Sequence, residues 1–150
     1  RTRRRRKTEG KRCDIVLTPD DRPLSDPDAE DTLFASPDAV SLETAYWLEV
    51  KTVSMFTTEG PFHRYSAELL APVSKDIRKL AEDRLIFHGG LLLVLFTADQ
   101  AVADHDVTVW LDRCTQRGYP VAPPIVRGFG LTDRLGNGWC AMALFPVRRL

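Results

Sequence analysis

The chain has 150 residues, 43% of them hydrophobic, so it is long enough for one domain with a real core and too short for two ordinary ones. Lys and Arg total 21, and so do Asp and Glu, so the net charge is zero and excludes an overall attraction to polyanions. The longest apolar run, residues 91–96, is far shorter than the ~20 residues that span a bilayer, so the sequence predicts a soluble protein.

The charges are unevenly distributed. Residues 1–12 contain eight basic residues against Glu9 alone, whereas residues 19–45 contain eight acidic residues against Arg22 alone. We therefore divide the chain into a basic arm, residues 1–11, and a single domain, residues 12–150. In the arm we expect four side chains to bind nucleic-acid phosphates, with an affinity that falls as salt rises: Arg3, Arg4, Arg5 and Arg6.

The three cysteines, Cys13, Cys114 and Cys140, are odd in number and far apart. They form no Cys-x-x-Cys pair and have no histidine at ligand spacing, so neither a disulfide framework nor a zinc site is indicated. This cysteine usage favours a reducing compartment, and we expect the protein to be cytoplasmic.

The first two expected elements are strands. In residues 12–18, Cys13, Ile15 and Leu17 alternate with polar or smaller residues, which is strand periodicity. Residues 19–45 are rich in Asp, Pro and Ser and predict a long exposed loop. The stretch YWLEVKTV, residues 46–53, is rich in β-branched and aromatic residues and predicts the next strand.

An amphipathic pattern follows a Gly60-Pro61 break and predicts a helix near 70–85, with Pro72 in its first turn. Its apolar residues are Leu69, Val73, Ile77, Leu80 and Ala81. The unalternating run LLLVLF at 91–96 is typical of a central strand covered on both faces, and we expect that strand near 90–96.

A second helix is expected near 104–117, with Asp104 or Asp106 as its N-cap and Gly118 at its end. Residues 125–131 and 139–145 flank the turn cluster 136–138 and predict a hairpin. The order of these elements predicts an α/β fold with a mixed central sheet flanked by helices.

Two charges inside the strand at 46–53 require an explanation. Side chains alternate along a strand, so Glu49 and Lys51 share one face. If residues 12–18 pair antiparallel with this strand, Asp14 lies near Glu49. Two carboxylates suit Mg²⁺, which keeps several waters when it is bound by one or two carboxylates. An adjacent ammonium would stabilise negative charge in a transition state.

This combination of Asp14 with Glu49-Val50-Lys51, an amphipathic basic helix and a buried strand resembles the PD-(D/E)XK nuclease superfamily, which has the restriction-endonuclease-like fold. The resemblance covers roughly residues 12–97. It implies that Asp14 and Glu49 bind Mg²⁺ or Mn²⁺ with help from the Val50 carbonyl, and that Lys51 is the catalytic lysine. It also implies a polar helix residue at the site, which corresponds to Lys75 or Lys79.

Two hypotheses of different classes follow. The first is a metal-dependent nuclease with Asp14, Glu49 and Lys51 as catalytic residues and Lys75 and Lys79 as further contacts to nucleic acid. The second is a non-catalytic domain of the same fold that binds nucleic acid or another protein, with a buried or incomplete site. We expect DNA as the partner, no membrane association, and either a homodimer or membership of a larger protein.

Overall fold

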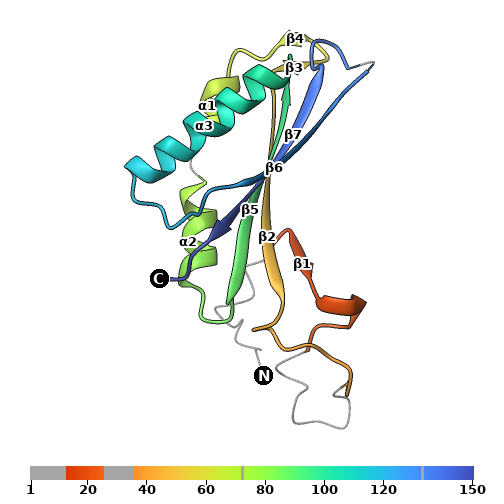
Figure 1. Ribbon diagram of the computed structural model, residues 1–150, viewed down its shortest axis with the longest axis vertical. Helices are drawn as coiled ribbons and strands as arrows, with labels where there is room; N and C mark the ends of the chain where they lie inside the picture. Colours follow the sequence, from red (N-terminus) through yellow and green to blue (C-terminus); the bar gives the residue numbers. More distant parts are fainter. Residues whose placement is uncertain (1–12, 26–35, 72, 133) are drawn as a thin grey trace, which may run out of the picture.

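The computed structural model describes residues 13–25, 36–71, 73–132 and 134–150. Its centre is a five-stranded sheet of order β1-β2-β5-β7-β6 (Figure 1). The strands are β1 (Ile15–Leu17), β2 (Tyr46–Ser54), β5 (His88–Thr97), β6 (Ile125–Gly130) and β7 (Trp139–Val147). β2 and β5 are parallel, and every other neighbouring pair is antiparallel, so the predicted mixed sheet is confirmed.

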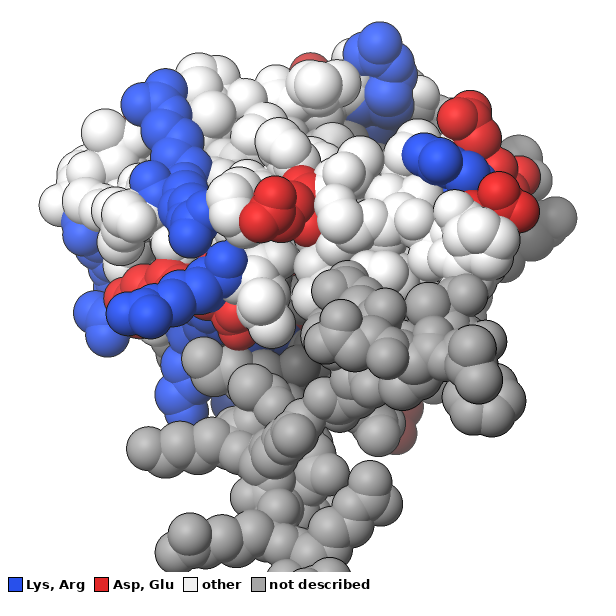
Figure 2. Space-filling model, turned by 90° about the horizontal axis from the view of Figure 1, so that it is seen from below, with Lys and Arg blue, Asp and Glu red and all other residues white. Residues whose placement is uncertain are grey.

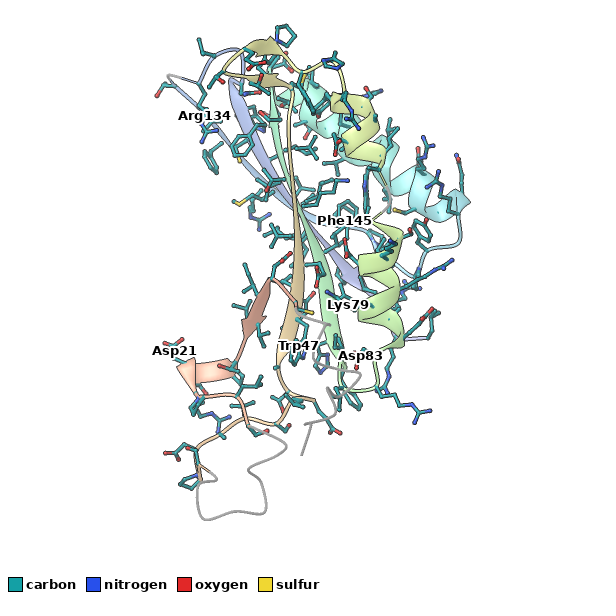
Figure 3. All side chains as sticks on the ribbon, turned by 180° about the vertical axis from the view of Figure 1, so that it is seen from behind. Asp21, Trp47, Lys79, Asp83, Arg134 and Phe145 are labelled. Atoms are coloured by element: carbon teal, nitrogen blue, oxygen red, sulfur yellow. The ribbon has the colours of Figure 1, made fainter. Side chains whose placement is uncertain are left out.

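Three helices pack against one face of this sheet: α1 (Tyr65–Leu70), α2 (Ser74–Glu82) and α3 (Gln100–Gln116). The views in Figures 1 and 3 place all three on the same side. Their apolar residues form one buried cluster with alternate residues of β2, β5 and β7, and Phe145 of β7 lies against Trp110 of α3 with ring centroids 4.3 Å apart. Within the described segments, no helix has the length and apolarity needed to cross a bilayer.

The other face of the sheet has no helix over it in the described part of the chain. Leu91, Leu93 and Leu95 face the helices and are fully buried, whereas Leu92, Val94 and Phe96 face the opposite side and are only half-buried. The expectation that this strand is covered on both faces is therefore wrong for the described residues. The apolar run led to the wrong prediction because side chains on the open face are partly shielded from solvent by their neighbours on β2, β5 and β7.

The single helix expected near 70–85 is two helices. α1 ends at Leu70, and Ala71 is extended, with φ −60° and ψ 151°. A proline disfavours the helical conformation in the residue before it, and residue 72 is proline, so the break follows directly from the sequence. Pro72 itself, which we expected in a first helical turn, lies outside the described residues.

α3 is longer than expected because it starts four residues before Asp104. Neither Asp104 nor Asp106 is its N-cap. Asp99 has extended backbone, and its Oδ1 accepts a hydrogen bond of 2.9 Å from the Val102 amide. The helix ends where expected, because Gly118 adopts a φ of +67°, which favours glycine.

The predicted hairpin of β6 and β7 is confirmed. Asn137, in its turn, is buried and joins the turn to the end of β2. It accepts a hydrogen bond from the Phe56 amide and donates to the Ser54 hydroxyl and the Phe56 carbonyl. Phe56 belongs to a small hairpin, β3 (Phe56–Thr57) with β4 (Gly60–Pro61), at this end of the sheet.

Asp99→Ala should lower the free energy of unfolding by about 1 kcal/mol, because it removes the carboxylate that caps α3. Asp104→Ala is the matched control, since Asp104 is exposed and contributes only its backbone carbonyl to Thr108. Urea unfolding of the two variants and the parent measures the difference. Equal losses in the two variants would show that the cap is not at Asp99.

Candidate active site

Asp14 is held against β2 next to Glu49. β1 pairs antiparallel with β2 through Ile15 and Leu48, and the Asp14 amide donates to the Leu48 carbonyl at 3.1 Å. Asp14 Oδ2 then accepts a hydrogen bond of 2.8 Å from the Val50 amide. Asp14, the residue before β1, thus uses its side chain to bind the backbone of β2. This makes Asp14 and Glu49 neighbours, although 34 residues separate them in the sequence.

Glu49 and Lys51 both face the helices. Their β5 partners in the sheet are Leu91 and Leu93, two fully buried residues of the helix-facing side. Glu49 is 7% exposed, and its Oε1 forms an ion pair with Lys79 of α2. Apart from this contact with Lys79, no side chain or amide of the described residues donates a hydrogen bond to Oε1. Figure 3 shows Lys79 between α2 and the sheet.

The ammonium of Lys79 is therefore the charge that neutralises Glu49. Burial by itself would lower the pKa of Lys79, but the hydrogen-bonding contact with Glu49 and the surrounding acidic groups, including Asp76, raise it instead. Lys79 stays charged at neutral pH. Of the two helix lysines that we considered, Lys79 lies at the site, whereas Lys75 is exposed.

Lys51 lies at the break between α1 and α2. Its Nζ donates a hydrogen bond of 3.3 Å to the Ala71 carbonyl. Burial lowers the pKa of Lys51, and the nearby carboxylates of Glu68 and Asp76 oppose this shift without cancelling it. A lysine with a lowered pKa beside a pair of carboxylates is a candidate functional group.

Cys13 is a neighbour that the sequence did not assign to the site. Burial raises its pKa to about 12, and a hydrogen bond to Glu49 contributes to that rise, so the thiol stays protonated at neutral pH. Strand alternation predicted that Cys13 shares a face with Ile15 and Leu17, which is wrong. Regular strand geometry begins only at Ile15, and Cys13 packs against the helix-side core.

Asp14 thus lies on the backbone of β2 beside Glu49, and Glu49 pairs with Lys79 and contacts Cys13, whereas Lys51 has Glu68 and Asp76 as its charged neighbours. The sequence predicted one helix here, so it did not predict that Glu68 and Asp76 lie near Lys51. They lie there because the helix breaks into α1, which carries Glu68, and α2, which carries Asp76. Arg3, Arg4, Arg5 and Arg6 lie outside the described residues. Val50 contributes its amide to Asp14.

A divalent cation at this site would have Asp14 and Glu49 as its side-chain ligands. Among the described residues, no group of three or more His, Cys, Asp or Glu side chains is arranged to hold a metal ion. Mg²⁺ needs no such group, because one or two carboxylates with several waters suffice. Among the described residues, Lys79 is the counter-charge of Glu49 Oε1, and no further hydrogen bond reaches this oxygen. Glu49 Oε1 is therefore suited to act as a ligand of a metal ion that replaces Lys79.

Comparison of the chain with protein-family models, with curated proteins and with solved structures gave no match.

Lys79→Met should lower the free energy of unfolding by about 3 kcal/mol, because it leaves the buried Glu49 carboxylate without its counter-charge. Adding Glu49→Gln in the same chain should recover most of this loss, since it removes the uncompensated charge. Lys75→Met is the control and should change stability by less than about 0.5 kcal/mol, because Lys75 is exposed. Chemical denaturation measures all three; a Lys79→Met variant as stable as the parent would contradict the pairing.

Proposed function

We propose that the chain is a nuclease of the restriction-endonuclease-like fold that uses Mg²⁺ or Mn²⁺ to hydrolyse phosphodiester bonds, with DNA as the preferred substrate. The observation that carries the proposal is the placement of Asp14 against the Val50 amide, directly beside Glu49, with Lys51 on the same face of β2. In this proposal Asp14, from the start of the domain, and Glu49 and Lys51, from β2, would supply two anionic oxygen donors and one ammonium.

The donor set fits a hard divalent cation. In the proposed site Asp14 and Glu49 hold the cation, assisted by the Val50 carbonyl. Bound Mg²⁺ would polarise a phosphoryl oxygen and lower the pKa of a coordinated water. Without the cation, Lys79 balances the charge of Glu49.

The chain's own residues have separable tasks in this proposal. The hydrogen bond from the Val50 amide orients Asp14. Lys79 neutralises Glu49, and a metal ion held by Glu49 would compete with Lys79 for the same carboxylate. Lys51, held by the Ala71 carbonyl, positions an ammonium that stabilises negative charge on the phosphate as it develops.

A second function is supported by one specific observation. Glu49 is 7% exposed and already paired with Lys79. If this pair never opens, the site is a structural ion pair, and the chain is a non-catalytic domain of the same fold that binds nucleic acid or another protein. Breaking a buried pair leaves an uncompensated charge, so the pair opens only when a stronger cation replaces Lys79.

Variants at the three residues distinguish these functions. Asp14→Asn and Glu49→Gln should abolish both Mn²⁺ binding and cleavage, because the site has few protein ligands to spare. Lys51→Ala should retain Mn²⁺ binding while the cleavage rate falls by roughly 10²–10³, the scale seen when one transition-state-stabilising donor is lost. Calorimetry with Mn²⁺ and a phosphodiesterase assay with Mg²⁺, Mn²⁺ or EDTA measure the two properties.

Glu59→Gln, at an exposed position of the β3–β4 turn, is the matched control and should behave like the parent. A parent that binds no divalent cation in the presence of nucleic acid would refute the nuclease and favour the non-catalytic domain. Cleavage that survives Glu49→Gln would show that the activity comes from elsewhere in the sample.

A further inference from the structure

Six basic side chains surround the helix that carries Lys79. Lys75 and Arg78 lie on the exposed side of α2, Arg84 lies in the turn that follows it, and Arg149 lies near the end of the chain. Arg113 and Arg117, at the end of α3, line a small cavity together with Ala71 and Val73, the residues that lead into α2. We call this set the basic band; it comprises Lys75, Arg78, Arg84, Arg113, Arg117 and Arg149.

Contacts between distant segments bring Arg149 and Arg84, two members of the band, together. Arg149 Nη2 donates to the Arg84 carbonyl at 3.4 Å, and the Leu150 amide donates to the Ala81 carbonyl at 3.1 Å. The end of the chain therefore lies against the end of α2. Figure 2, which views this end of the molecule from below, shows Lys and Arg side chains gathered on its left side, with a smaller number of acidic ones among them.

The band has few counter-charges in the described part of the chain. In the segments that the structure describes, none of the six is within ion-pair distance of a carboxylate, whereas Arg64 pairs with Glu68 and Lys79 with Glu49. Exposed acids near the band are Glu82 and Asp112. Grouped like charges repel one another, and a chain of zero net charge has enough acids to pair them. The arrangement is suited to an external polyanion.

The position and length of the band fit a nucleic-acid strand. Lys75 is one helical turn from Lys79, so the band begins beside the candidate site. The nine residues of α2 extend over roughly 13 Å, which is about four nucleotide steps of 3.4 Å. Phe87 at the far end is 40% exposed, and the guanidinium of Arg149 lies 4.1 Å from its ring centroid. An exposed ring of this kind also suits stacking of an unpaired base.

We propose that the basic band binds the phosphate backbone of a nucleic-acid strand and leads that strand to Glu49 and Lys51. This inference deepens the proposed function and depends on it for the cleavage step, but not for binding. The contacts are to phosphates, so the band sets affinity and not sequence preference.

The test is a triple variant, Lys75→Gln with Arg78→Gln and Arg84→Gln, in the full chain. All three residues are exposed, so the fold should be retained, which thermal unfolding checks. Binding to a 20-nucleotide single strand and to its duplex is measured in EDTA at several salt concentrations. Counterion release predicts that affinity for the duplex falls roughly fivefold per lost contact at 0.15 M salt, and that the salt slope flattens by about 0.9 per contact.

The control removes the same charge elsewhere, through Arg22→Gln with Arg64→Gln and Arg127→Gln, three exposed residues outside the band. It should bind nearly as well as the parent. Unchanged binding in the band variant, or an equal loss in the control, overturns the proposal. Binding to phosphatidylserine vesicles is measured in parallel. A band variant that loses affinity for these vesicles alone also overturns the proposal, because the surface would then bind a membrane.

The outcomes for the band and for the nuclease are separable. A parent that binds oligonucleotides through the band but cleaves neither with Mg²⁺ nor with Mn²⁺ refutes the nuclease and leaves the band in place. A parent that cleaves, together with a band variant that binds as tightly as the parent, refutes the band and leaves the nuclease in place.

Discussion

The ion pair between Glu49 and Lys79 is the contact on which the rest of the site depends. It joins β2 to α2 inside the helix-side layer, where Glu49 is almost fully buried. A buried carboxylate is costly unless a counter-charge accompanies it, so the position of α2 and the charge of Glu49 constrain each other. Cys13 contacts Glu49, and Asp14 accepts a hydrogen bond from the Val50 amide beside it. Lys51, on the same strand, donates to the carbonyl of Ala71, the residue that follows α1.

In the proposed nuclease, the same pair would give the site two alternative states. With Lys79 in place, the carboxylate is balanced inside the protein. With a divalent cation in place, the carboxylate would become a ligand, and we would expect Lys79 to turn towards the exposed side of α2, which carries Lys75 and Arg78. A nucleic-acid strand along the basic band would give the displaced ammonium a new anionic partner. Metal binding and substrate binding would then favour each other through one lysine.

Much of the sheet could be predicted from the sequence because strand periodicity is a local property. The alternation in β1 and β2 and the turn between β6 and β7 identified strands whose pairing the structure confirms. Local patterns were less informative where two segments meet. The break at Ala71, the cap at Asp99 and the inward position of Cys13 each depend on one or two residues at an element boundary. The open face of β5 could not be predicted. A run of six apolar residues is compatible both with a strand covered by helices on one face and with a strand covered on both faces.

For the site, the sequence identified Glu49 and Lys51 as partners on one face but could not supply their counter-charges, which come from α1 and α2. The central claim is that Asp14 and Glu49 share a divalent cation. Anomalous diffraction from crystals soaked in Mn²⁺ tests it most directly. The account predicts one manganese peak between the two carboxylates, with Lys79 moved away from Glu49. A map with no peak there and an intact Glu49–Lys79 pair would contradict it.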